Sequence, residues 1–162
     1  MDTTIIQKLK LANTSYQTAD HLTFVTYPMV QDMKLMKSVL KHLDDTINYT
    51  IDAFLEYEYY YKNISTIPTK IEDKLMIIFN SGTKRHNFDR QKLLLIRDIK
   101  DFLKYEQKSK TEFIKKNQLV FADSEFQIKT LNYDRIKMYV QEVKSFLDLI
   151  SKVIEHVGRI RR

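Results

Sequence analysis

Basic side chains crowd into residues 81–92, which read SGTKRHNFDRQK. A helix is expected to start within this stretch, and a helix N-terminus offers free amides and a partial positive charge that suit a phosphate group. A mobile basic loop is the alternative, because the stretch contains no Gly-x-Gly or Walker-type loop. We interpret five residues as a candidate nucleic-acid or anion site and assign no catalytic residue. The five residues are Lys84, Arg85, His86, Arg90 and Lys92.

Carboxylates and a histidine share one face of the helix predicted for residues 33–62. They are His42, Asp45, Asp52 and Glu56. Converging side chains of these types could hold a metal ion. A di-iron bundle, however, needs Glu-x-x-His on two helices, and neither Glu-x-x-His nor His-x-x-Glu occurs in the chain. We therefore expect a solvated face, with no metal site and no cofactor.

Asp20 and His21 could form an acid–base couple, since a carboxylate can orient an imidazole. Sequence neighbours on a helix point about 100° apart, so the two side chains do not face each other. A partly exposed polar edge is the favoured interpretation of this pair.

Four tyrosines near residue 60 form an unusual aromatic cluster. Tyr57 and Tyr61 continue the apolar seam of the predicted helix, so Tyr59 and Tyr60 must point elsewhere. Exposed aromatic rings can stack on bases or anchor a protein interface. We predict that Tyr59 and Tyr60 form an interface, because Glu56 and Glu58 would repel phosphates. Cover beneath the loop at 64–70 is the alternative.

Composition restricts the fold class and the membrane topology. The 162 residues are 43% hydrophobic and 30% charged, with only two glycines and two prolines. An all-β sandwich or barrel needs many turns and is therefore disfavoured. There is no cysteine, which favours a reducing cytoplasmic location. We find no signal-peptide pattern and no apolar run of about 20 residues, so we expect no membrane partner.

Charge is distributed unevenly along the chain. Residues 81–162 contain 19 Lys and Arg and 11 Asp and Glu, whereas residues 1–80 contain 8 Lys, no Arg and 10 acids. The excess of basic residues in this second half suggests an anionic partner, and RNA or another polyanion is the first candidate. Lysine-rich helices with solvated faces are the alternative explanation.

Apolar periodicity predicts four principal helices and a shorter one. The principal helices cover about 3–26, 33–62, 89–107 and 133–157, and the shorter one starts at Pro68. Pro28 is expected to end the first helix, because proline disfavours helix at the preceding residue. Gly82 is expected to end the shorter helix in the left-handed conformation. The candidate N-caps are Asp32, Asn87 or Asp89, and Asn132.

The helical spacing of apolar residues does not continue through residues 109–130. The sequence Ser-Lys-Thr-Glu at 109–112 matches a capping box and predicts a short helix to about residue 116. Residues 119–130 are β-branched and aromatic, and Asp123–Glu125 marks a turn, which predicts a small hairpin. The predicted fold is an all-α antiparallel bundle of four principal helices in a single domain, 1–162, with short extra helices and this hairpin.

The first two helices resemble the opening of HEPN-type bundles. The resemblance lies in LKLANTSYQTADHL at 9–22 and HLDDTINYTIDAFL at 42–55, and the whole chain is similar to small uncharacterised archaeal helical proteins. It implies a compact bundle, a homodimer and RNA as a partner. The ribonucleases of that family have Arg followed by four to six residues and then His. Here Arg85 directly precedes His86 and Arg90 follows it, so no catalytic residue is transferred.

Three functions remain as hypotheses. The first is a non-enzymatic bundle that self-associates and binds nucleic acid through its basic half. The second is a HEPN-type ribonuclease with a non-standard Arg/His site. The third is a purely structural subunit for protein interaction.

Overall fold

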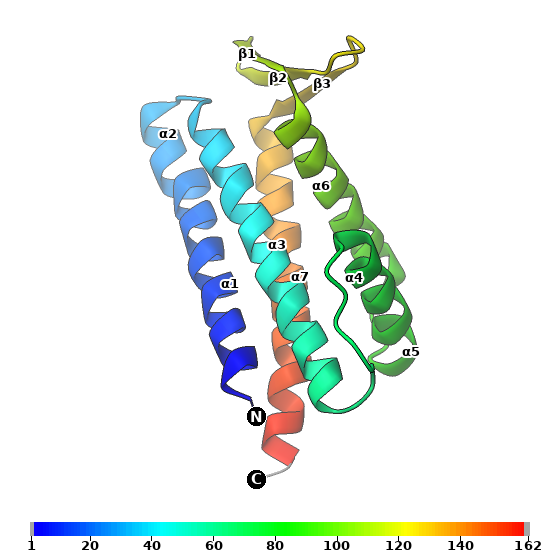
Figure 1. Cartoon of the computed structure of the whole chain (residues 1–162). Helices are drawn as coiled ribbons and strands as arrows, with labels where there is room; N and C mark the ends of the chain where they lie inside the picture. Colours follow the sequence, from blue (N-terminus) through cyan, green and yellow to red (C-terminus); the bar gives the residue numbers. More distant parts are fainter. Residues whose placement is uncertain (1, 161–162) are drawn as a thin grey trace.

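Four long helices form the body of the protein, as the apolar periodicity predicts (Figure 1). The computed structural model describes the backbone of residues 2–160 and the side chains as far as residue 156. The long helices are α1 (Thr3–His21), α3 (Leu35–Tyr60), α6 (Arg90–Lys108) and α7 (Tyr133–Ile160). The prediction of a mostly helical protein is confirmed, and a small antiparallel sheet lies at one end of the bundle (Figure 1).

The first helix continues past Pro28, so the prediction that proline ends it is wrong. After α1 the chain forms a π-helical turn, η1 (Leu22–Thr26), and one further turn, α2 (Tyr27–Val30). Pro28 lies just after the π-helical turn, and the Thr23 carbonyl in that turn accepts from the Tyr133 hydroxyl at 2.7 Å. The helix ends at Gln31, whose φ of 50° is left-handed. Proline therefore coincides with a local widening of the helix instead of its end.

Helices α1, α3 and α7 pack side by side around the main core (Figure 1). The seam predicted for the second helix is buried, and its fully covered side chains include Met36, Leu43, Ile47 and Phe54. Facing side chains of α7 include Ile136, Val140, Val143 and Ile150. Each such side chain contributes about 1.5–3 kcal/mol on burial. The stability of α3 therefore comes more from tertiary packing than from its intrinsic helix propensity.

An arm between α3 and α6 adds a further layer. It consists of an irregular segment at 61–70, then α4 (Ile71–Ile77), η2 (Ile78–Gly82) and α5 (Thr83–Arg85). Figure 1 shows the arm running back along α3 and beside α6. The arm brings the basic stretch at 81–92 against α3, although the two are separate in sequence.

The sheet contains one strand more than the predicted hairpin. Strands β1 (Thr111–Lys115), β2 (Gln118–Ala122) and β3 (Ile128–Asn132) pair antiparallel in the order β1-β2-β3. The helix predicted for residues 109–116 is therefore wrong. The Ser109 hydroxyl donates to the carbonyls of Thr111 and Ala122 and does not cap a helix.

Two turns connect the strands. Lys116 and Asn117 form a two-residue turn with φ of 49° and 58°, which matches the twist of paired strands. The predicted turn at 123–125 is present, and the Asp123 carboxylate accepts from the amides of Glu125 and Gln127. The sheet leads into α7, whose predicted cap, Asn132, accepts from the amide of Arg135. None of the helices in the described part of the chain has the length and hydropathy needed to cross a bilayer.

Candidate functional site

A tight turn between Gly82 and Phe88 positions the basic stretch. The amides of His86 and Phe88 both donate to the carbonyl of Gly82. A Cβ atom on Gly82 would lie 3.0 Å from Cε2 of Phe88 and closer still to Cδ2, so the close approach requires glycine. Gly82 has a helical φ of −61°, and the predicted left-handed conformation is wrong for this residue. Asn87, with φ of 53°, makes the left-handed turn, and Asp89 caps α6 by accepting from Gln91.

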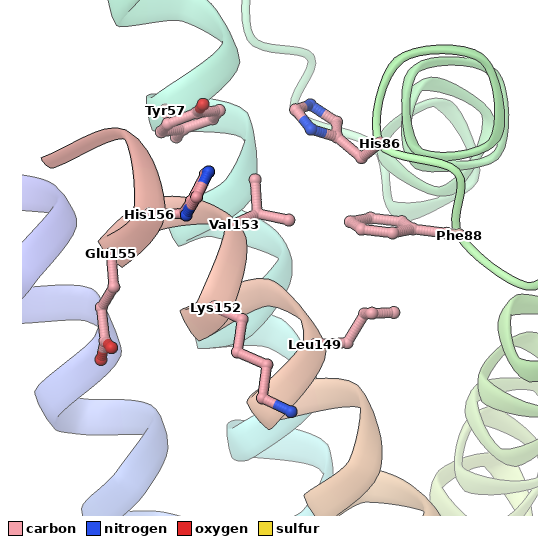
Figure 2. Close-up of a pocket in the computed structure, with 8 residues that line it drawn as sticks. All are labelled: Tyr57, His86, Phe88, Leu149, Lys152, Val153, Glu155 and His156. Carbon is pink, nitrogen blue, oxygen red and sulfur yellow. The ribbon is translucent and has the colours of Figure 1, made fainter. Parts of the chain in front are cut away.

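A groove of about 600 Å³ opens where this turn meets the end of α7. Its apolar walls are formed by Tyr57, Phe88, Leu149 and Val153, and its polar side chains are His86, Lys152, Glu155 and His156. Figure 2 shows His86 and His156 on different elements, both beside Tyr57, with Lys152 further along α7. The groove therefore combines two imidazoles and an ammonium group with apolar surface.

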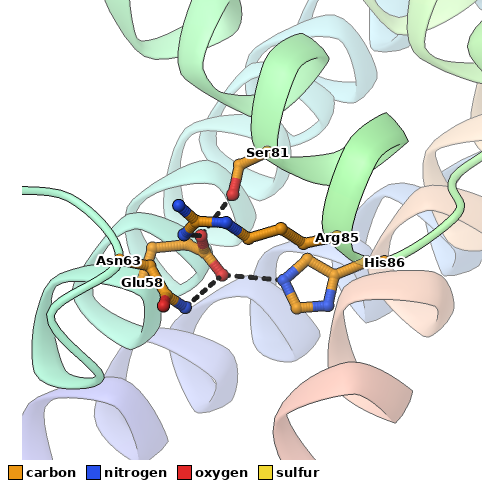
Figure 3. Close-up of polar contacts among 5 residues, drawn as sticks. All are labelled: Glu58, Asn63, Ser81, Arg85 and His86. Carbon is orange, nitrogen blue, oxygen red and sulfur yellow. Dashed lines mark hydrogen bonds and ion pairs between the residues drawn. The ribbon is translucent and has the colours of Figure 1, made fainter.

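Glu58 lies behind His86 and its side chain is completely buried. Four side chains surround its carboxylate (Figure 3). Nε2 of His86 lies 2.7 Å from Oε1, a guanidinium nitrogen of Arg85 lies 3.2 Å from Oε2, and the side-chain amide nitrogen of Asn63 lies 3.4 Å from Oε1. The Ser81 hydroxyl also donates to Oε2. A buried carboxylate without partners would cost several kcal/mol, so these donors make its burial tolerable.

The burial of Glu58 corrects a prediction. Its sequence neighbourhood suggested a carboxylate that would stand with Glu56 on the surface and repel phosphates. Glu58, however, follows Phe54 by four residues and Ile51 by seven, and both of those side chains are fully buried. These spacings place Glu58 on the core face of α3, and they are the feature of the sequence that predicts its burial. The donors that surround it could not be read from that spacing, because all four lie between α3 and α6, on the arm at 61–89.

Aromatic rings and Glu58 together hold the imidazole of His86. Its ring centroid lies 5.4 Å from that of Phe54, 6.0 Å from that of Tyr57 and 5.6 Å from that of Phe88. The side chain is only 15% exposed, and the exposed part lines the groove. A carboxylate that engages Nε2 fixes the tautomer and leaves Nδ1 as a proton acceptor. The arrangement is thus suited to accepting or transferring a proton at Nδ1.

The structure divides the five predicted anion-binding residues. Arg85 and His86 engage Glu58, although 46% of the Arg85 side chain is still exposed. Lys84 and Arg90 are exposed, and the ammonium group of Lys92 lies 3.2 Å from the Ser145 hydroxyl on α7. Three of the five therefore remain on the surface, and two connect the surface to the buried carboxylate. Anion binding by the five residues stays a prediction.

Lys152 and His156 were missed by reasoning from the sequence. They lie on the polar side of α7, four residues apart, and nothing local distinguishes them from other charged side chains of that helix. Their significance depends on the arm, which brings His86 and Phe88 to the same groove.

Tyr59 and Tyr60 are exposed by 50% and 49%, as their position outside the seam predicts. They line a second groove together with Glu56, Lys62 and Asn63. Their role as an interface stays a prediction.

The carboxylate face of α3 has the character of a solvated, ion-paired surface. Asp52 lies 3.4 Å from the ammonium group of Lys8 and 2.7 Å from that of Lys74. Among the side chains described as far as residue 156, no three His, Cys, Asp or Glu groups are arranged to hold a metal ion.

Asp20 accepts from the Tyr16 hydroxyl at 3.0 Å, and burial together with this hydrogen bond raises the pKa of Tyr16 well above its ordinary value.

Comparison of the chain with protein-family models, with curated proteins and with solved structures found no significant match. The HEPN resemblance therefore stays a hypothesis.

Proposed function

We propose that the protein is a non-enzymatic helical module that binds single-stranded RNA at the corner formed by residues 84–92 and the end of α7. The observation that carries the proposal is a groove between the cationic segment at 84–92, which supplies His86 and Phe88, and the end of α7. Lys84, Arg85 and Arg90 are exposed in this segment, and Lys152 and His156 line the groove from α7.

The two parts of this corner suit the two parts of a nucleotide. Exposed Lys and Arg side chains neutralise phosphates and release counterions, which gives most of the affinity for a polyanion. The groove offers apolar walls from Leu149 and Val153 beside His86, and a base can pack against such a surface. The excess of basic residues over 81–162 adds a longer-range attraction.

The test is the affinity for a short fluorescently labelled single-stranded RNA, measured by anisotropy at about 50 mM and about 200 mM salt. We expect the triple variant Lys84→Ala, Arg90→Ala, Lys152→Ala to bind more weakly. Its log–log salt dependence should be shallower by about 2, since each lost contact with a single strand removes about 0.7. Arg85 is left intact because it also binds Glu58.

A matched control replaces three exposed lysines elsewhere, Lys10, Lys34 and Lys70, by alanine. This control has the same change in net charge. Equal loss of affinity in the two variants would show diffuse electrostatic attraction and would contradict the proposed corner. Absence of salt-dependent binding in the native protein would favour the purely structural role.

Ribonuclease activity is the second candidate, and the orientation of His86 favours it. Glu58 engages Nε2, so Nδ1 is available to accept a proton, and His156 on the same groove could donate one. Cleavage of labelled RNA that survives repurification and disappears in both His86→Ala and His156→Ala would support this candidate. Cleavage that persists in both variants would come from a contaminant.

A further inference from the structure

The sheet end of the molecule exposes several large apolar side chains. Phe126 is 88% exposed in the turn between β2 and β3, and Ile128 at the start of β3 is 65% exposed. Met29 in α2 is 80% exposed, and its neighbour Val30 is exposed as well. Figure 1 shows α2 and the sheet at the same end of the bundle. Exposed apolar side chains gathered in one region mark a contact surface for a protein or a membrane.

The turn at 123–127 holds Phe126 away from the core. The Phe126 amide donates to the carbonyl of Asp123 at 3.2 Å, and the Asp123 amide donates to the carbonyl of Gln127 at 3.2 Å. The Tyr105 hydroxyl also donates to the Gln127 carbonyl, at 2.6 Å. Phe126 has φ of 60°, a left-handed value that is unusual for a bulky side chain. The turn therefore presents an aromatic ring to solvent in a backbone conformation that glycine or asparagine would adopt more easily.

The outer face of the sheet continues this apolar surface. Side chains alternate between the two faces along a strand, and Leu119 and Phe121 of β2 point into the core. Their register with the neighbouring strands places Phe113 and Ile128 on the opposite face. The strand residues of that face include one lysine, Lys115, and no acidic residue. The outer face is therefore apolar over one part and cationic at the other.

Exposed lysines occupy the same end of the molecule. Lys34 follows α2, Lys110 precedes β1, Lys115 ends β1 and Lys116 lies in the turn to β2. All four are exposed, and none forms an ion pair with the side chains that the structure describes. Their ammonium groups are therefore available to an anionic partner.

Most acidic side chains near these lysines are already engaged. Glu112 binds the ammonium group of Lys37 at 2.8 Å. The carboxylates of Asp32 and Asp123 accept hydrogen bonds from backbone amides. Glu125 is an exposed acid beside Phe126, and the four unpaired lysines outnumber it. This end of the molecule therefore combines projecting apolar side chains with excess positive charge.

We propose that the sheet end binds an anionic lipid surface, with Phe126, Ile128 and Met29 entering the head-group boundary and the lysines contacting the head groups. Stable attachment to a membrane surface takes an apolar insertion and a basic cluster together, and this end has both. The expectation of no membrane partner rests on the absence of a spanning segment, which a surface contact does not need.

The chemistry of this end favours lipid over the other possible partners. Aliphatic side chains such as Met29, Val30 and Ile128 gain little from RNA, whose apolar surface is confined to the faces of its bases. They project from separate elements, and a fluid lipid surface can accept all of them without a matching shape. The contact is independent of the RNA-binding corner, because that corner lies at the start of α6 and the sheet follows its end.

The test is cosedimentation of the full chain, without RNA, with vesicles of phosphatidylcholine alone or mixed equally with phosphatidylglycerol. We expect binding to the mixed vesicles only, and added salt should weaken it. Phe126→Ser should lower the partition coefficient about tenfold or more, since a phenylalanine side chain leaves water on insertion. Met76→Ser is the matched control, because Met76 is 61% exposed on α4, and it should bind like the native chain.

A lysine pair supplies a second readout. Lys110→Ala, Lys116→Ala should lower the partition coefficient about tenfold or more, because each lysine near an anionic surface contributes separately. Lys10→Ala, Lys70→Ala has the same change in net charge at other exposed positions and should bind like the native chain. Circular dichroism of each variant checks that the helices are intact.

Three results would overturn the proposal. The first is no binding of the native chain to the mixed vesicles, including the case in which Phe126→Ser abolishes a dimer instead, which would assign this end to a second copy. The second is binding that Phe126→Ser and the lysine pair both leave unchanged. The third is binding that is lost in Lys84→Ala, Arg90→Ala, Lys152→Ala but kept in Phe126→Ser, which would place the lipid contact at the RNA-binding corner.

Discussion

Nε2 of His86 lies 2.7 Å from Oε1 of Glu58, although 28 positions separate the two residues. This contact attaches the arm at 61–89 to α3 and holds the imidazole at the edge of the groove. One interaction therefore serves both the packing of the arm and the geometry of the candidate site.

Replacing Glu58 by alanine should lower the free energy of unfolding by about 3–5 kcal/mol, the usual effect of removing one partner of a buried ion pair. The loss is expected because Arg85 and His86 would keep their positive or polar groups beside an empty buried site. Urea unfolding followed by circular dichroism measures the change. Glu125→Ala is the control, since that side chain is exposed and its loss should change stability by less than about 0.5 kcal/mol. A similar effect for both variants would show that the buried contact contributes little.

Gly82→Ala should destabilise the protein because its Cβ would overlap the ring of Phe88. Overpacking of this kind costs about 1–3 kcal/mol. The backbone of Gly82 is helical, so alanine would otherwise be preferred there by about 1 kcal/mol. In a Phe88→Ala background the same substitution should therefore become stabilising. A double-mutant cycle from urea unfolding tests this reversal of sign, and additive effects would contradict the steric explanation.

Glu106→Gln should stabilise the protein at neutral pH but not near pH 4. Burial raises the pKa of the Glu106 carboxyl above its ordinary value of 4.5. The charge of Lys37 opposes this shift in pKa, and the charges of Glu112 and Asp44 add to it. Below pH 4.5 the carboxyl is protonated in both states and contributes nothing. As the pH rises past that value, the unfolded state ionises more readily, so stability falls until the folded pKa has also been passed. Urea unfolding of both proteins near pH 4 and near pH 7 should show a difference only at the higher value. Equal differences in the free energy of unfolding at the two pH values would show that the effect comes from packing.

Asn117→Val should weaken the β1–β2 hairpin. Asn117 has φ of 58°, where an L-residue with a Cβ loses about 1–2 kcal/mol and a β-branched residue fares worst. Asn117→Gly, which adopts this conformation freely, should be neutral or slightly stabilising. Hydrogen exchange of the β1 and β2 amides, followed by NMR, reports the local effect. Faster exchange in both variants would indicate that the Asn117 side chain matters more than its backbone conformation.

Several parts of the fold could be predicted because their causes are local. The apolar spacing along α3 and α7, and the caps at Asp89 and Asn132, each depend on residues within a few turns of one another. The error at 109–116 was also local in origin. Residues 109–112 match a capping box, but the two-residue turn at Lys116 and Asn117 lets the segments on either side of it pair as strands.

Taken alone, the sequence determined the long helices, the exposure of Tyr59 and Tyr60, and the concentration of basic residues after position 80. Only the tertiary structure decided which of those residues form a site. The position of Glu58 on α3 indicates a buried carboxylate, but its donors come from residues 5 to 28 positions later. Likewise, His156 meets the groove only because α7 packs against α3 near His86. Such contacts follow from how helices pack, since side-chain periodicity fixes which face of a helix is buried but not which distant groups it meets there.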